Sequence, residues 1–127
     1  MRINYERMVF MNKRILAISI ILLMMCAMAA SAQNYDADRL AKDARSTIGT
    51  ASADRSRALN SKDATFVLQQ MNRIYAEYEK IYNRFNSLVN RGVEINESNS
   101  REIARVTDTL FEFFNEVKNH HQRLLMQ

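Results

Sequence analysis

The chain has 127 residues, no proline and two glycines, and it carries 18 basic against 14 acidic side chains. Proline and glycine are the residues that punctuate strands and turns, so this composition indicates long uninterrupted helices. The net charge of +4 is weak evidence for nucleic-acid binding, because four of the basic residues and one acid lie in residues 1–32. Nucleic-acid binding normally shows as a clustered basic face, and we expect no such partner.

The N-terminus has the pattern of a cleavable export signal. Basic residues precede an uncharged apolar run, which ends in the small-residue triplet Ala-Ser-Ala before Gln33. That triplet is the pattern that signal peptidase accepts. We predict a signal peptide over residues 1–32, cleavage between Ala32 and Gln33, and a mature chain that is periplasmic or secreted. Either Met1 or Met11 is the true start, since MNKR opens a compact leader by itself.

Two routes to membrane attachment stay open. An uncleaved leader would anchor the chain, although the apolar run at 15–32 is short for the ~20 residues that cross a bilayer. Lipidation of Cys26 would also attach it, but Met25 stands where the lipidation pattern has a small residue. Cleavage after Ala32 would remove the only cysteine, and the mature chain could then form neither a disulfide nor a cysteine metal site.

The first predicted helix of the mature chain covers about residues 36–59. Alanines recur along it every seven residues, at Ala37, Ala44, Ala51 and Ala58. Alanines allow helix axes to approach closely but bury little area each, at roughly 25 cal/mol per Å². Gly49 in the middle of this helix costs about 0.5 to 1 kcal/mol relative to alanine. We therefore expect the first helix to dock most weakly.

Two further helices are predicted over about residues 62–91 and 100–125, because their apolar positions alternate steps of four and three. Asn60 or Ser61 is expected to cap the start of the second helix. Gly92 is expected to end that helix in a left-handed conformation.

The third helix begins with a predicted capping box between Asn99 and Glu102. Helices two and three both carry an additional apolar column, which includes Tyr75, Tyr82 and Phe114 and which we expect the first helix to cover. The predicted fold is a single all-α domain over residues 33–127, an antiparallel up-down-up three-helix bundle.

Glu116, His120 and His121 are the candidate metal ligands. Glu116 lies one turn before His120 on the third helix, but adjacent histidines point about 100° apart. A tight site needs three or four ligands, so we expect no cofactor. A metal- or haem-binding carrier that uses His120 and His121 is kept as an alternative function.

Phe66 and Phe111 lie outside the apolar stripes of their helices. They either contact the first helix and the turns, or they form an exposed patch that marks a partner surface. Since no nucleophile motif or paired catalytic carboxylate is recognisable, we expect no enzymatic activity. The predicted function is a non-enzymatic protein of the bacterial cell envelope that binds another protein, as a chaperone, inhibitor or assembly factor does. Self-association stays open, and so does the membrane-attached structural protein that Cys26 or an uncleaved leader would give.

Overall fold

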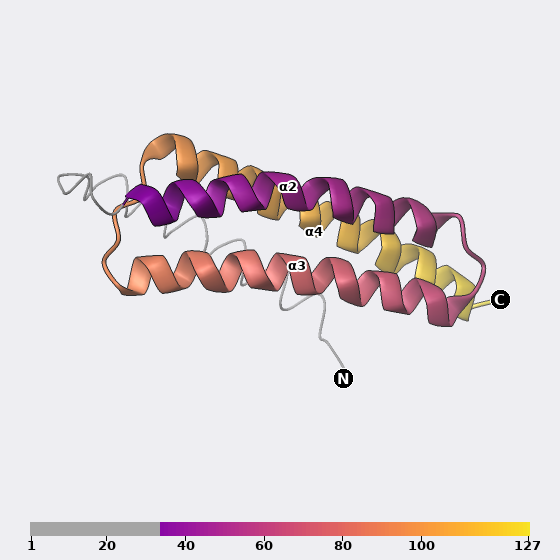
Figure 1. The fold of residues 1–127 in the computed structure, drawn as a ribbon. Coiled ribbons are helices and arrows are strands. Elements are labelled where there is room, and N and C mark those ends of the chain that lie inside the picture. Colours follow the sequence, from indigo (N-terminus) through magenta and orange to yellow (C-terminus); the bar gives the residue numbers. More distant parts are fainter. Residues whose placement is uncertain (1–33) are drawn as a thin grey trace.

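The computed structural model describes residues 34–127, which form three helices packed against one another (Figure 1). α2 spans Asn34–Leu59, α3 spans Ala64–Asn90 and α4 spans Glu97–Leu125. No strand occurs between residues 34 and 127, so the prediction of an all-helical bundle is confirmed. The predicted leader, its cleavage site at Ala32 and Gln33, and Cys26 lie outside the described residues.

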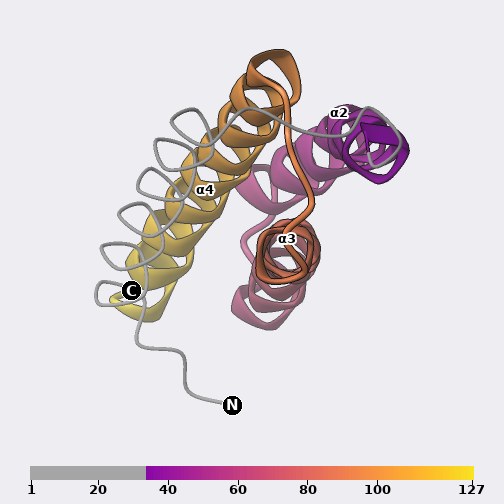
Figure 2. The ribbon, with the colours of Figure 1, turned by 90° about the vertical axis from the view of Figure 1, so that its left-hand side faces the viewer.

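Each helix packs against the other two. Figure 2, which views the bundle nearly end-on, shows α2, α3 and α4 around a common centre. The loop between α2 and α3 and the loop between α3 and α4 lie at opposite ends of the bundle (Figure 1). Among the three described helices, none has an apolar stretch long enough to cross a membrane.

The cap of α3 differs from the predicted one. The Asp63 carboxylate accepts hydrogen bonds from the backbone N–H groups of Thr65 at 3.0 Å and Phe66 at 3.3 Å. Ser61 instead accepts a hydrogen bond from the Asp63 backbone N–H at 3.1 Å. The predicted cap at Asn60 or Ser61 is therefore wrong, because Asp63 satisfies the free N–H groups of the first turn.

The end of α3 is as predicted. Gly92 has a φ of 73°, its N–H donates to the Val89 carbonyl at 3.0 Å, and the Val93 N–H donates to the Leu88 carbonyl at 2.9 Å. This pair of bonds is a Schellman motif, and Leu88 and Val93 are both buried beside it. The left-handed conformation expected of Gly92 is confirmed.

The start of α4 is another correction. Asn96 caps the helix, and its side-chain oxygen accepts a hydrogen bond from the Asn99 N–H at 2.8 Å. The predicted capping box of Asn99 and Glu102 is wrong, because α4 begins three residues earlier than expected. The Asn99 side chain is then free to donate to the Asp38 carboxylate of α2 at 2.5 Å.

The predicted apolar stripe of α3 forms the centre of the bundle. All of its positions are buried, namely Val67, Met71, Ile74, Tyr78, Ile81, Phe85 and Leu88. On α4 the stripe is buried from Ile103 to Val117 except for Phe113, which is half-buried. The sequence periodicity therefore identifies the core of the α3–α4 pair.

At Tyr75 the additional aromatic column of α3 packs against Phe114 of α4. The Tyr75 ring lies 5.5 Å from the Phe114 ring, and the Tyr78 ring meets Phe111 edge-on at 5.3 Å, measured between centroids. The α3 side chains that contact α2 include Arg73 and Arg84. At ~100° per residue these arginines lie about half a turn around α3 from Tyr75. The expectation that the first helix covers this column is corrected accordingly.

Gly49 provides a test of the stability of α2. Gly49 is exposed, and a Cβ atom added there meets nothing within 4 Å. Gly49→Ala is expected to raise the free energy of unfolding by about 0.5 to 1 kcal/mol, because alanine loses less backbone entropy in a helix. Urea denaturation measures this difference. Gly92→Ala is the control and is expected to lower stability by about 1 kcal/mol, since φ is positive there. An unchanged or lower stability for Gly49→Ala would contradict the placement of Gly49 at an exposed position within α2.

Candidate functional site

The surface that joins α2 to the other helices has an unusual composition. α2 buries five alanines and one larger apolar side chain, Leu40. The buried residues of α3 and α4 include much larger ones, such as Phe85 and Phe114. Because alanine removes little apolar area from water, each alanine position contributes less to docking than a buried leucine would. The prediction of a thin alanine stripe on the first helix is confirmed.

One position of this stripe is a carboxylate. Asp54 follows Ala51 by three residues and precedes Ala58 by four, and it is only 1% exposed. Arg57 pairs with one carboxylate oxygen, and the Arg73 Nε of α3 lies 3.5 Å from the other. Burying a charge costs free energy that its partners must offset, so Asp54 adds polar attachment to α3 where leucine would add apolar contact.

Two more ion pairs join α2 to α3. An Arg84 Nη lies 3.0 Å from the Asp43 carboxylate, and an Arg91 Nη lies 3.9 Å from that of Asp36. These side chains are partly or largely exposed, and pairs of this kind contribute at most about 1 kcal/mol each. Together they hold α2 in register against α3, but they add little to the free energy needed to separate the two helices.

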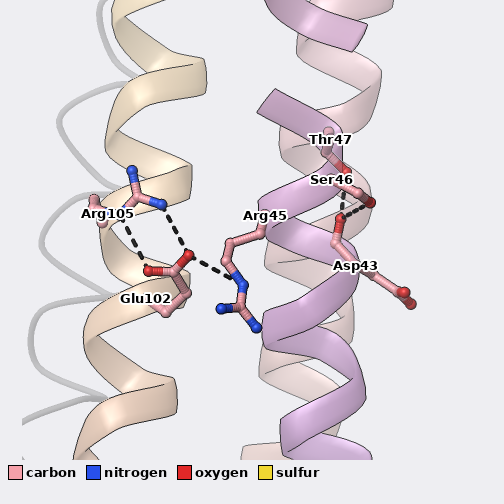
Figure 3. Close-up of polar contacts among 6 residues, drawn as sticks. All are labelled: Asp43, Arg45, Ser46, Thr47, Glu102 and Arg105. Atoms are coloured by element: carbon pink, nitrogen blue, oxygen red, sulfur yellow. Dashed lines mark hydrogen bonds and ion pairs between the residues drawn. The ribbon is translucent and has the colours of Figure 1, made fainter. Parts of the chain in front are cut away.

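The opposite side of α2 is joined to α4 through Glu102. Arg45 extends from α2 toward Glu102, while Asp43 extends from the other side of the helix (Figure 3). The Arg45 Nε lies 3.6 Å from Glu102, whose two oxygens also accept hydrogen bonds from Arg105 at 2.8 and 3.1 Å. The hydrogen bonds from Arg105 lower the pKa of Glu102, burial opposes this, and the charges of Arg105 and Arg45 add to it.

A second contact with α4 involves Arg55, the neighbour of Asp54 on α2. The Arg55 guanidinium binds one Glu116 oxygen through Nε at 2.7 Å and through an Nη at 2.5 Å. Its central carbon also lies 5.2 Å from the centroid of the Phe113 ring. Arg55 therefore combines an ion pair with a cation–π contact, and both require α2 and α4 to stay together.

The structure places the three candidate metal ligands in different environments. Glu116 is bound by Arg55, the His120 Nε2 lies 2.7 Å from the Ser61 carbonyl oxygen, and His121 is half-buried. Over residues 34–127, no group of three or more histidine, cysteine, aspartate or glutamate side chains is arranged to hold a metal ion. His120 thus contacts the α2–α3 loop.

The two candidate partner-binding phenylalanines also differ. Phe111 is 3% exposed and packs on Tyr78 and Phe114, so it does not form the exposed patch that was one of its two predicted roles. These two ring neighbours lie on α3 and α4. Phe66 is half-buried in the first turn of α3.

Other apolar side chains are exposed that the sequence analysis did not single out. They are Tyr35, Leu125 and Met126, at the two ends of the described chain. Asp54 was also missed, although its spacing from Ala51 and Ala58 places it within the stripe and could have revealed it.

Comparisons of this chain with protein-family models, with curated proteins and with solved structures gave no match.

Hydrogen exchange tests whether α2 is the labile helix. Its amides are expected to exchange well before those between Ile74 and Phe85, because α2 is held by alanines and surface ion pairs. In ~1 M sodium chloride, where the screening length falls to ~3 Å, exchange should accelerate more in α2 than in α3. Mass spectrometry of peptides from both helices measures this, with α3 as the internal reference. Uniform protection of the three helices would refute it.

Proposed function

We propose that this protein is a non-enzymatic helical bundle of the bacterial cell envelope that binds another protein, as a chaperone, inhibitor or assembly factor does. In this proposal the chain is exported, its mature form begins at Gln33, and its three helices run up, down and up. The leader pattern supports export. The composition of the α2 surface supports binding, and it is the observation that carries the proposal.

The proposed mechanism is displacement of α2 by a helix of the partner. Separating α2 opens the common core of the bundle, to which α3 and α4 contribute large apolar side chains such as Ile74, Phe85 and Leu110. A partner helix would bury those faces again by laying its own apolar side chains in the groove. α2 buries only five alanines and Leu40, so separating it exposes little apolar area of its own. Water hydrates the charged groups of its ion pairs once they part, so the loss of these pairs costs little free energy.

Tethering α2 to α3 tests this mechanism. Asp43→Cys and Arg84→Cys, in a Cys26→Ala background, place thiols where an ion pair now joins the two helices. A short bifunctional thiol reagent then prevents α2 from leaving. Crosslinking in cell envelopes followed by mass spectrometry is expected to find a partner with the untethered protein, and to find at least about tenfold less of it with the tethered protein.

The control tether joins Glu97→Cys to Arg101→Cys, which replaces an ion pair within α4 and leaves α2 free. This variant is expected to retain the partner after treatment with the same reagent. Equal retention by both tethered proteins would contradict displacement of α2. Failure of every form to retain a partner would contradict protein binding itself.

Export is tested on the protein recovered from the native host. Its intact mass is expected to match residues 33–127 with the N-terminal glutamine cyclised. Retention of residues 1–32, or a lipid on Cys26, would instead support the membrane-attached protein. A Soret band or one equivalent of metal, lost on replacement of His120 and His121, would support the carrier and contradict the proposal.

A further inference from the structure

A charged groove lies between the N-terminal half of α2 and the C-terminal half of α3. It encloses about 530 Å³ of solvent-accessible space. Its charged lining consists of Asp36, Arg39 and Asp43 from α2, Lys80 and Arg84 from α3, and Arg91 directly after the end of α3. The groove is separate from the contacts between α2 and α4.

The positive charges of this groove exceed the negative ones by two. Asp43 pairs closely with Arg84, but the 3.9 Å separation between Asp36 and Arg91 is long for an ion pair. Within residues 34–127, neither Arg39 nor Lys80 has an ion-pair partner. Two uncompensated cations therefore face the same space from different helices.

The two carboxylates of the groove offset part of the repulsion among its four cations, and an anion placed between the cations relieves the rest. On α3, Lys80 and Arg84 lie four residues apart on one face of the helix, and Arg91 follows directly after the helix ends. Arg39 approaches from α2, so the cations surround the groove from two sides. Arginine presents several N–H donors in a plane, which suits the oxygens of phosphate groups.

We propose that this groove binds a multivalent oxyanion of the phosphate class. The anion contacts Arg39 on one side and Lys80, Arg84 and Arg91 on the other. Asp43 holds Arg84 in place. A soluble phosphate compound and the phosphorylated headgroup of a lipid share this chemistry. The space is large enough for two linked phosphate groups, which makes pyrophosphate a suitable probe.

An anion that bridges α2 and α3 stabilises the docked position of α2. An anion that binds only the bundle with α2 docked lowers the population of forms in which α2 has separated. The effect grows with the ratio of the ligand concentration to its dissociation constant. The site does not depend on the proposed function, because it requires only the charges and the space of the closed bundle.

Calorimetric titration of the full chain with inorganic pyrophosphate tests this site at constant ionic strength. Wild-type protein is expected to bind one equivalent and to show slower hydrogen exchange in α2. Arg39→Gln and Lys80→Gln are each expected to weaken binding about tenfold, which corresponds to the loss of one charge-assisted hydrogen bond. Both residues lack ion-pair partners among the described residues, so these variants should keep the fold.

Arg123→Gln is the matched control, since it removes an exposed cation near the C-terminus of α4. It should bind pyrophosphate as the wild type does. No saturable binding, or equal weakening by Arg123→Gln, would overturn the proposal.

Flotation with vesicles that contain phosphatidic acid distinguishes a lipid headgroup from a soluble phosphate compound. Vesicle binding that Arg39→Gln weakens supports a lipid headgroup, and pyrophosphate binding without vesicle binding supports a soluble compound.

Discussion

α2 packs against its neighbours with alanines, and this constraint governs the rest of the structure. Small side chains let the helix axes come close but remove little apolar surface from water. Charged side chains at both edges of α2 supplement this thin apolar contact. Asp43 and Asp54 bind arginines of α3, while Arg45 and Arg55 bind glutamates of α4. Such pairs specify register more than they add stability, because water competes for the same groups.

The α3–α4 pair is held by a different kind of interaction. Large apolar and aromatic side chains meet across this interface. The Tyr75 ring packs on Phe114, and the Tyr78 ring packs on Phe111. Burial, followed by the charge of Glu79 and a hydrogen bond to it, raises the pKa of Tyr75 to about 12. The phenol thus stays neutral at physiological pH. The bundle consists of an α3–α4 pair that packs through large side chains and a third helix that packs through alanines, with ion pairs at both of its edges.

The sequence predicts this architecture better than it predicts the polar contacts. Apolar periodicity identifies the cores of α3 and α4 and the alanine stripe, because the 3.6-residue repeat fixes which side chains share a face. The predicted starts of α3 and α4 were wrong, and Asp63 and Asn96 are the residues that cap these helices. Several neighbouring residues could cap each helix, and only the folded chain selects one. The attachment of Arg55 to Glu116 was not predicted, because it joins residues 61 positions apart whose relative heights depend on packing.

The short connection between α3 and α4 has a consequence for how the chain is made. The Schellman motif at Gly92 brings two adjacent segments together, so their pairing closes only a small loop. Any chain emerges from the ribosome with its N-terminus first, and α2 is therefore complete before the helices that receive it exist. A segment rich in alanine and charge can wait in water without aggregating, as a leucine-rich one could not. The same composition that loosens α2 in the folded protein thus protects the unfinished chain.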